Sequence, residues 1–216
     1  MIERFDAHSA DAQQSDATAA ARKTYHHGNL REQLIVAVRE LVETKGPDGF
    51  SIAEASRVAG VSSAAPYKHF KDKEAVLHAL VIDGMSRLGE TMLAAIAPLP
   101  VGSLERINAL GQCYIDFARI QPGVFRLMFG LTRGHESEQE IVEKGRACFQ
   151  IVITCVAECL GIAPDDQRAM ERAYSLWCFV HGHSFLVIDD KSNKADFQID
   201  EPSILAAVSR ALVRPL

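Results

Sequence analysis

Residues 50–74 read Phe50-Ser-Ile-Ala-Glu-Ala-Ser-Arg-Val-Ala-Gly-Val-Ser-Ser-Ala-Ala-Pro-Tyr-Lys-His-Phe-Lys-Asp-Lys-Glu74 and follow the residue order of a helix-turn-helix. Ser51 is suited to cap a first helix over residues 51–59, and Gly60 is suited to the tight turn after it. We expect the inner face of the first helix to consist of Ile52, Ala55, Val58 and Ala59. The two small alanines would let the next helix cross closely.

A second helix is predicted over residues 62–70, with Ser62 as its cap and Phe70 closing the core beneath it. Its outward face carries small or polar side chains, which suits a helix that enters the major groove of DNA. Hydroxyl, phenol, imidazole and ammonium groups at its edges could donate to phosphates. The residues that we expect to contact DNA are Ser51, Ser62, Ser63, Ala64, Ala65, Tyr67, Lys68, His69 and Lys73.

Pro66 is the unusual residue of this second helix. Proline is tolerated only near the first turn of a helix, because it has no backbone N–H to donate. With Ser62 or Ser63 as the cap, Pro66 takes the third or fourth helical position and disfavours ideal helix geometry at Ala65. We therefore expect a slightly displaced recognition helix. Few of its side chains can reach base edges, so thymine methyl contacts and DNA shape would supply part of the specificity.

The charge of the chain is unevenly distributed. The chain has 216 residues, 48% of them apolar, and a formal net charge of −5. Residues 1–19 carry −3, residues 20–74 carry +2 and residues 75–216 carry −4. A mildly basic segment on an acidic body is expected where one end of a protein meets a polyanion. The basic and aromatic run at residues 22–27 could cross a phosphate or reach the minor groove, or could be a solvated arm.

Helical periodicity continues along the chain, and no segment alternates convincingly as a strand. We predict an all-α fold of about nine helices, with a disordered tail (1–22), a helix-turn-helix domain (23–72) and a regulatory and dimerisation domain (73–216). Outside the motif, helices are predicted over residues 29–45, 72–97, 103–121, 122–132, 136–160, 166–189 and 202–213. Their expected start signals are Pro122, Pro164, Pro202 and a capping box of Ser137 with Glu140.

From Tyr25-His-His-Gly-Asn-Leu30 to Lys73-Glu-Ala-Val-Leu77 the sequence closely resembles the amino-terminal domain of TetR/AcrR-type transcriptional repressors. The resemblance is carried by Gly60-Val-Ser-x-x-x-x-Tyr67-x-His-Phe70-x-x-Lys73-Glu, although Pro66 stands where the family usually has an apolar residue other than proline. Trp177 with His181-Gly182 resembles the carboxy-terminal domain of a branch named for a Trp-His-Gly pattern. The resemblance implies an all-helical homodimer, DNA contacts from the positions named above, and an inducer pocket in the body.

Several aromatic and sulfur-containing residues of the body are candidates for that pocket, with core or dimer packing as the alternative. A buried His181 would need a hydrogen-bond partner and could supply the pocket's polar group. Cys155 and Cys159 share a helix face, but no His or acid completes a tetrahedral set, so we expect packing and neither a metal nor a cofactor. The candidate ligand-binding residues are Phe117, Phe125, Met128, Phe149, Trp177 and His181.

Other classes of protein are disfavoured by what the sequence lacks. The longest charge-free apolar run, residues 173–188, is too short to cross a bilayer, and the amino terminus does not resemble a signal peptide. The five cysteines show no disulfide or zinc spacing. We therefore expect a reduced, cytoplasmic protein without membrane association. No nucleophile elbow, phosphate loop or HExxH motif is present, so enzyme activity is not expected.

Our leading hypothesis is a ligand-responsive transcriptional regulator, expected to be a repressor, that binds a palindromic operator in double-stranded DNA as a homodimer. One short recognition helix reads few base pairs, so two must be held about one helical turn apart. The candidate dimer face consists of residues 173–188 with Ile204, Leu205, Val208 and Leu212. The resemblance implies that the helix from Lys73 to Ala97 couples ligand to DNA. The alternatives are a regulator or activator without a small-molecule inducer, and a helical enzyme.

Overall fold

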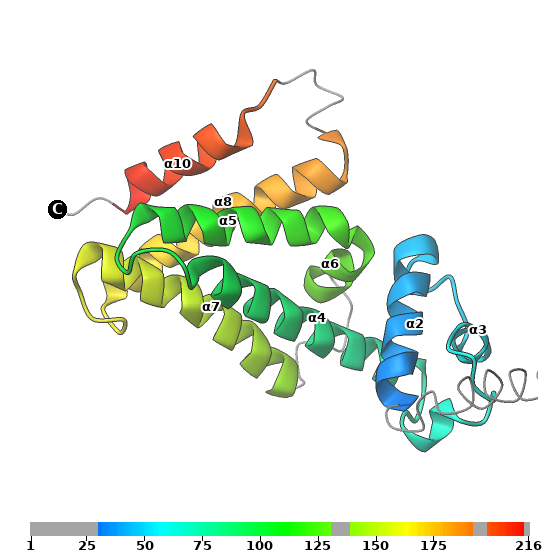
Figure 1. Ribbon diagram of the computed structural model, residues 1–216. Helices are drawn as coiled ribbons and strands as arrows, with labels where there is room; N and C mark the ends of the chain where they lie inside the picture. The colour runs from blue at the N-terminus through cyan, green and yellow to red at the C-terminus, as the bar shows by residue number, and fades with distance from the viewer. Residues whose placement is uncertain (1–29, 131–138, 192–197, 214–216) are drawn as a thin grey trace, which may run out of the picture.

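The computed structural model describes residues 30–130, 139–191 and 198–213, and within these ranges every regular element is helical (Figure 1). The predicted all-α class is confirmed, with eight α-helices and one short 3-10 helix in the described residues. The predicted tail, the run at residues 22–27 and the Ser137 capping box lie outside the described residues. The elements are α2 (Leu30–Lys45), α3 (Ile52–Val58), η1 (Pro66–Lys68), α4 (Lys73–Ile96), α5 (Leu104–Ile120), α6 (Pro122–Phe129), α7 (Gln139–Leu160), α8 (Gln167–Ile188) and α10 (Glu201–Leu212).

The amino-terminal module consists of α2, α3, η1 and the start of α4, and the predicted signals Ser51 and Gly60 take their expected roles. The Ser51 hydroxyl accepts a hydrogen bond from the Glu54 amide at 3.2 Å, and Asp72 likewise caps α4. Gly46 and Gly60 adopt φ values of 76° and 69°, the left-handed region that glycine enters without steric cost. The helix ends and the turn of the motif are therefore set by local residue chemistry.

The predicted second helix of the motif is wrong in extent. Residues 62–70 contain only the three-residue 3-10 helix η1, and Ser62 does not cap it. Since Pro66 has no N–H to donate to the Ser62 carbonyl, that carbonyl instead accepts from the Ala65 amide at 3.0 Å, one residue closer. The Phe70 amide donates to the Pro66 carbonyl at 2.9 Å, which brings the chain back to the core.

One inward residue of α3 was also predicted wrongly. Val58 is 44% exposed, whereas Ser56 is buried and donates its hydroxyl to the Ile52 carbonyl at 2.9 Å. The inner face of α3 is thus rotated toward Ala55 and Ser56, and a serine can occupy it because its own helix supplies the hydrogen-bond acceptor.

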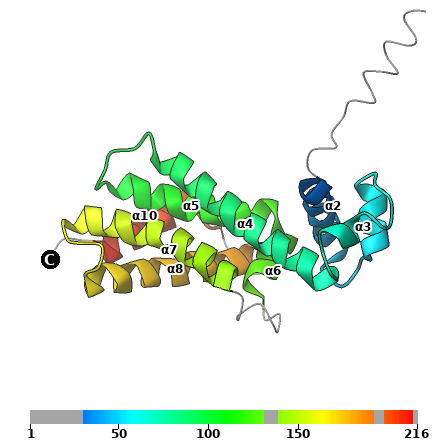
Figure 2. The same ribbon diagram turned by 90° about the horizontal axis from the view of Figure 1, so that it is seen from below.

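The body is a bundle that receives α4 from the module (Figures 1 and 2). Helix α4 begins beside η1 and then packs against α5, α6 and α7, while α8 packs on α5 and α7. Helix α10 covers α5 and α8 at the side away from α4. None of the described helices combines the length and the apolar character that crossing a bilayer requires.

The joint between the module and the body is formed by α2 and the first turn of α6, and we call it the α2–α6 joint. The Glu43 carboxylate accepts hydrogen bonds from the backbone amides of Gly123 at 2.8 Å and Val124 at 2.9 Å. These are two of the amides that a helix amino terminus leaves without an internal partner, and the negative charge also suits the helix dipole. Gly123 permits the approach, since an added Cβ would lie 2.8 Å from the Val42 carbonyl oxygen.

A second polar contact reinforces the joint from α4. Arg39 on α2 donates to Asp83 on α4 at 2.7 Å, and Arg87 donates to the same carboxylate oxygen at 2.8 Å. Arg87 also donates to the side chain of Gln121, between α5 and α6, at 2.7 Å. The orientation of α2 is therefore tied to both α4 and the start of α6.

The close approach at the joint predicts that Gly123→Ala lowers the free energy of unfolding by about 1–3 kcal/mol, because backbone atoms of α2 must move to admit the methyl group. Gly145→Ala is the matched control: its Cβ would meet nothing within 4 Å, and alanine raises helix propensity by up to about 1 kcal/mol. Urea unfolding of both variants measures the difference. Equal stabilities would show that α2 and α6 are free to separate.

Candidate DNA-binding surface and ligand cavity

The outer tip of the module presents the side chains predicted to contact DNA. Tyr67 is 62% exposed although it is large and aromatic, and Lys68 and His69 beside it are also exposed. Pro66 and Phe70, which flank this group, are buried and anchor η1 to the core. Of the other predicted contacts, Ala65 is half-buried, and the exposed ones are Ser51, Ser62, Ser63 and Ala64.

Two of the predicted phosphate donors already have partners within the module. The Lys73 ammonium donates to the Phe50 carbonyl at 2.8 Å and lies 4.4 Å from the centroid of the Phe50 ring. The Ser51 hydroxyl oxygen accepts from α3 and keeps its hydrogen available. Lys73 is therefore placed as a support for the start of α4, and the exposed cation nearest in sequence to Tyr67 is Lys68.

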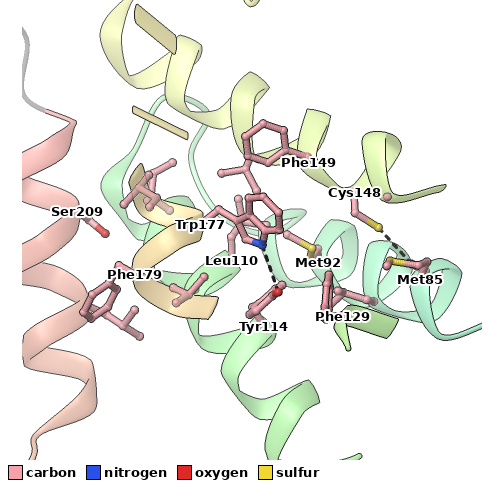
Figure 3. A pocket seen from close by; sticks show the side chains of 18 of the residues that line it. Met85, Met92, Leu110, Tyr114, Phe129, Cys148, Phe149, Trp177, Phe179 and Ser209 are labelled. Carbon is pink, nitrogen blue, oxygen red and sulfur yellow. Dashed lines mark hydrogen bonds between the residues drawn. The ribbon is translucent and has the colours of Figure 1, made fainter. Parts of the chain in front are cut away.

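The body encloses an apolar cavity of about 390 Å³ between α4, α5, α7, α8 and α10 (Figure 3). This volume lies within the range of small-molecule sites. Aromatic rings of Tyr114, Phe129, Phe149 and Trp177 line it together with methionine, leucine and valine side chains. Arg146 also borders it, but Arg146 is exposed on α7. The arrangement can bind a molecule that is mostly hydrocarbon.

A hydrogen-bonded group of three side chains lies in the cavity wall. Trp177 Nε1 donates to Tyr114 Oη at 3.2 Å, and Oη lies 2.8 Å from His181 Nδ1. Figure 3 shows Tyr114 from α5 and Trp177 from α8 pointing toward one another. Burial raises the pKa of Tyr114 and lowers the pKa of His181, so both are neutral at neutral pH.

The predicted ligand-binding residues divide between this cavity and the core around it. Phe149 and Trp177 line the cavity, and His181 reaches it through Tyr114. Phe117, Phe125 and Met128 are buried but do not border it. Phe125 stacks edge-on against Tyr114 with ring centroids 5.5 Å apart, so it supports the wall from behind.

Tyr114 lies in the cavity wall but is not among the ligand-binding residues predicted from the sequence. Its signal was its place on the apolar stripe of α5, one turn after Leu110, where a buried phenol needs a polar partner. The sequence also offered no reason to single out Glu43. A carboxylate on a helix surface is expected to be solvated unless the helix that it contacts is known.

Cys155 and Cys159 pack within the body, as expected. Cys155 is buried, and Cys159 donates its thiol to the Ser103 carbonyl at 3.2 Å. Burial raises the pKa of Cys159 to about 11, which keeps the thiol protonated. Within the residues that the structure describes, no group of three or more His, Cys, Asp or Glu side chains could hold a metal ion.

Helix α8 carries an outward apolar stripe at every fourth residue, consisting of Met170, Tyr174, Cys178, Gly182 and Leu186. The prediction for α10 needs correction. Leu205 is buried against Gly111 of α5, and Val208 borders the cavity. The exposed apolar residues of α10 are the small ones, Pro202, Ala207 and Ala211, because its larger side chains are needed to cover α5 and α8.

Two models of known protein families match the chain, one in the amino-terminal module and one in the body. A family model described as "Bacterial regulatory proteins, tetR family" matches residues 34–80, and one described as "Tetracyclin repressor-like, C-terminal domain" matches residues 107–209. The uncharacterized HTH-type transcriptional regulator YobS of Bacillus subtilis (strain 168) is 24% identical over 160 residues, which are 74% of this chain and 80% of YobS.

Two solved structures share the fold over most of the chain. A protein with unknown function from Rhodococcus sp. RHA1 is 30% identical and superposes with a TM-score of 0.75, covering 89% of this chain and 97% of that one. FadR from Bacillus subtilis, solved in complex with stearoyl-CoA, superposes with a TM-score of 0.66 at 17% identity, covering 86% of this chain and 98% of FadR. At the latter identity the likeness concerns the fold alone. Given the two family matches and the helix-turn-helix module, the chain belongs to the TetR family of DNA-binding transcription regulators.

Proposed function

We propose that the protein is a ligand-responsive transcriptional repressor that binds a palindromic operator as a homodimer. The observation that carries the DNA-binding part is the exposed group of Tyr67, Lys68 and His69 on a buried base of Pro66 and Phe70. An aromatic ring and a cation held out by a rigid turn suit contact with a phosphate backbone. Base contacts would come from the small residues 62–65, with DNA shape supplying further specificity.

The proposed dimer uses the outward stripe of α8 and the small exposed residues of α10. A twofold axis beside α8 would bring two stripes together, and the small α10 residues would allow a close approach. Because both helices belong to the body, pairing them leaves each module free to face one duplex (Figure 2). Two modules held in this way would read two half-sites.

The proposed coupling of ligand to DNA runs through α6 as well as α4. Phe129 at the end of α6 borders the cavity, and the start of α6 is bound by Glu43 of the module. A ligand that displaces Phe129 would shift α6 along or about its axis and so alter the α2–α6 joint. Only a ligand that binds one arrangement better than the other changes operator affinity.

The cavity supports this ligand-responsive form over a regulator without an inducer. The structure of FadR with stearoyl-CoA shares the fold, which is consistent with a ligand in the body. Titration of operator DNA with and without candidate compounds tests the choice. Release of DNA by a compound that occupies the cavity supports the proposal, and operator binding that no cavity ligand alters would favour the inducer-free alternative.

Lys68→Ala tests the phosphate contact. We expect weaker binding to all duplexes and a slope of log affinity against log salt that is smaller by about one per monomer, because one cation fewer displaces counterions. Lys144→Ala, which makes the same charge change on α7 in the body, is the control and should leave the slope unchanged. Equal slopes for the two variants would remove Lys68 from the contact surface.

Leu186→Glu tests the dimer face. Leu186 is 47% exposed in one subunit, and placing a charge in the proposed interface should raise the dimer Kd by about tenfold or more. Leu93→Glu is the control, since Leu93 on α4 is similarly exposed at 53% but lies off the stripe. Sedimentation velocity measures both. Dissociation by the control alone would place the interface on α4.

Glu43→Gln tests the α2–α6 joint. The amide keeps one acceptor oxygen for the two α6 amides, so the joint should weaken by about 1–3 kcal/mol. We expect the ratio of operator affinity to non-specific DNA affinity to fall severalfold, because the modules are held less firmly at the required spacing. Glu40→Gln, an exposed glutamate one turn earlier on α2, makes the same charge change and should keep the ratio. An unchanged ratio in Glu43→Gln would exclude the joint from operator recognition.

A further inference from the structure

Among the described residues, the cavity wall contains few polar side chains, and its one charged side chain, Arg146, is exposed. Its hydroxyls are those of Tyr114 and Ser209, and its thiol, Cys148, donates to the Met85 carbonyl at 3.2 Å. Arg146 is on the exposed side of α7, and no carboxylate borders the cavity in the described part of the chain. A charged group carried past Arg146 into the apolar interior would lose its hydration without gaining a counterion there, which costs several kcal/mol.

The two hydrogen bonds that Tyr114 already makes limit what else its hydroxyl can bind. A phenol has one hydrogen and two lone pairs, and the indole N–H of Trp177 can only donate, so it occupies one lone pair of Tyr114 Oη. The other partner at Oη is His181 Nδ1. A neutral imidazole with its hydrogen on Nε2 accepts the phenol hydrogen there. The opposite tautomer would leave the buried phenol hydrogen facing apolar side chains without an acceptor.

This arrangement leaves Tyr114 with a single open lone pair and no open hydrogen. A ligand hydroxyl can donate to that lone pair, whereas an ether or carbonyl oxygen would face it with another lone pair. Accepting from Tyr114 would require the phenol to leave His181, and His181 to change its tautomer. The wall therefore distinguishes donors from acceptors at one point inside an otherwise apolar space.

We propose that the cavity binds an uncharged, largely hydrocarbon alcohol whose hydroxyl donates to Tyr114 Oη. This inference deepens the proposed function and rests on it, because it names the ligand class of the same cavity. The Tyr114, Trp177 and His181 group sets the hydrogen-bonding polarity of the ligand, and the apolar wall excludes ions. The alkyl part of the ligand packs against side chains such as Met92, Leu110 and Phe149 (Figure 3).

The test compares four probes that share a decyl chain: 1-decanol, decyl methyl ether, undecanoate and decylammonium. Binding to the full chain at neutral pH is measured by calorimetry and by the fluorescence of Trp177, which is the one tryptophan of the sequence. We expect 1-decanol to bind about fivefold more tightly than the ether, since it gains one hydrogen bond, and more tightly than either ion. Equal affinities for 1-decanol and the ether, or tighter binding of an ion, would overturn the inference.

Three variants assign the preference to a residue, and calorimetry serves for all of them. Tyr114→Phe should remove the preference for 1-decanol over the ether while the ether still binds. Phe149→Leu should weaken both probes and keep their ratio, since it removes apolar contacts, including that with the Trp177 ring, but no hydrogen-bonding group at Tyr114. Ser209→Ala should also keep the ratio, because Ser209 lies on α10, away from the Tyr114 and Trp177 pair (Figure 3). Loss of the ratio in Ser209→Ala would overturn the role of Tyr114, even if Tyr114→Phe fails to fold.

The experiment separates this inference from the proposed function, because probe binding is measured without DNA. A preference for 1-decanol without any change in operator affinity supports the ligand class and contradicts ligand response. Release of the operator by a compound of another class, with no preference among the four probes, overturns the ligand class and leaves the proposed function standing.

Discussion

The orientation of the module relative to the body depends on one contact, between the carboxylate of Glu43 on α2 and the first turn of α6. The carboxylate satisfies the amides of Gly123 and Val124, which the helix itself cannot satisfy. The approach is possible only because residue 123 has no side chain. A helix of the module is thereby fixed to a helix that borders the cavity. Without this contact, α4 and its ion pair with Arg39 would be the main remaining constraint on the module.

Local chemistry made much of the fold predictable. The cap at Ser51 and the left-handed glycine at position 60 act within a few residues, so the sequence alone locates them. Pro66 was recognised as unfavourable for a helix, but its effect was underestimated. The loss of one N–H changed the bonding of Ser62 and Ala65 and left a single 3-10 turn. The length of this helix depends on whether α-helical or 3-10 hydrogen bonds are more stable around Pro66. The sequence alone does not give that difference in free energy.

The candidate sites were less predictable because they depend on how helices far apart in sequence meet. An aromatic residue on an apolar stripe can face a cavity, as Phe149 and Trp177 do, or fill the core, as Phe125 does. The same ambiguity affected α10, where Leu205 turned inward to cover Gly111. Membership of the Trp-His-Gly branch stays a prediction from the sequence. What the structure adds is a reason for that pattern in this chain, since Trp177 and His181 bond to one phenol.

The length of α4 has a mechanical consequence. Its 24 residues extend about 36 Å at 1.5 Å per residue. A rotation of roughly 5° about the end in the body would displace the other end by about 3 Å over that length. This is close to the rise of about 3.4 Å between neighbouring base pairs. In the proposed dimer, a change at the cavity smaller than the width of a methyl group would thus move each module out of register with its proposed half-site by nearly one base pair.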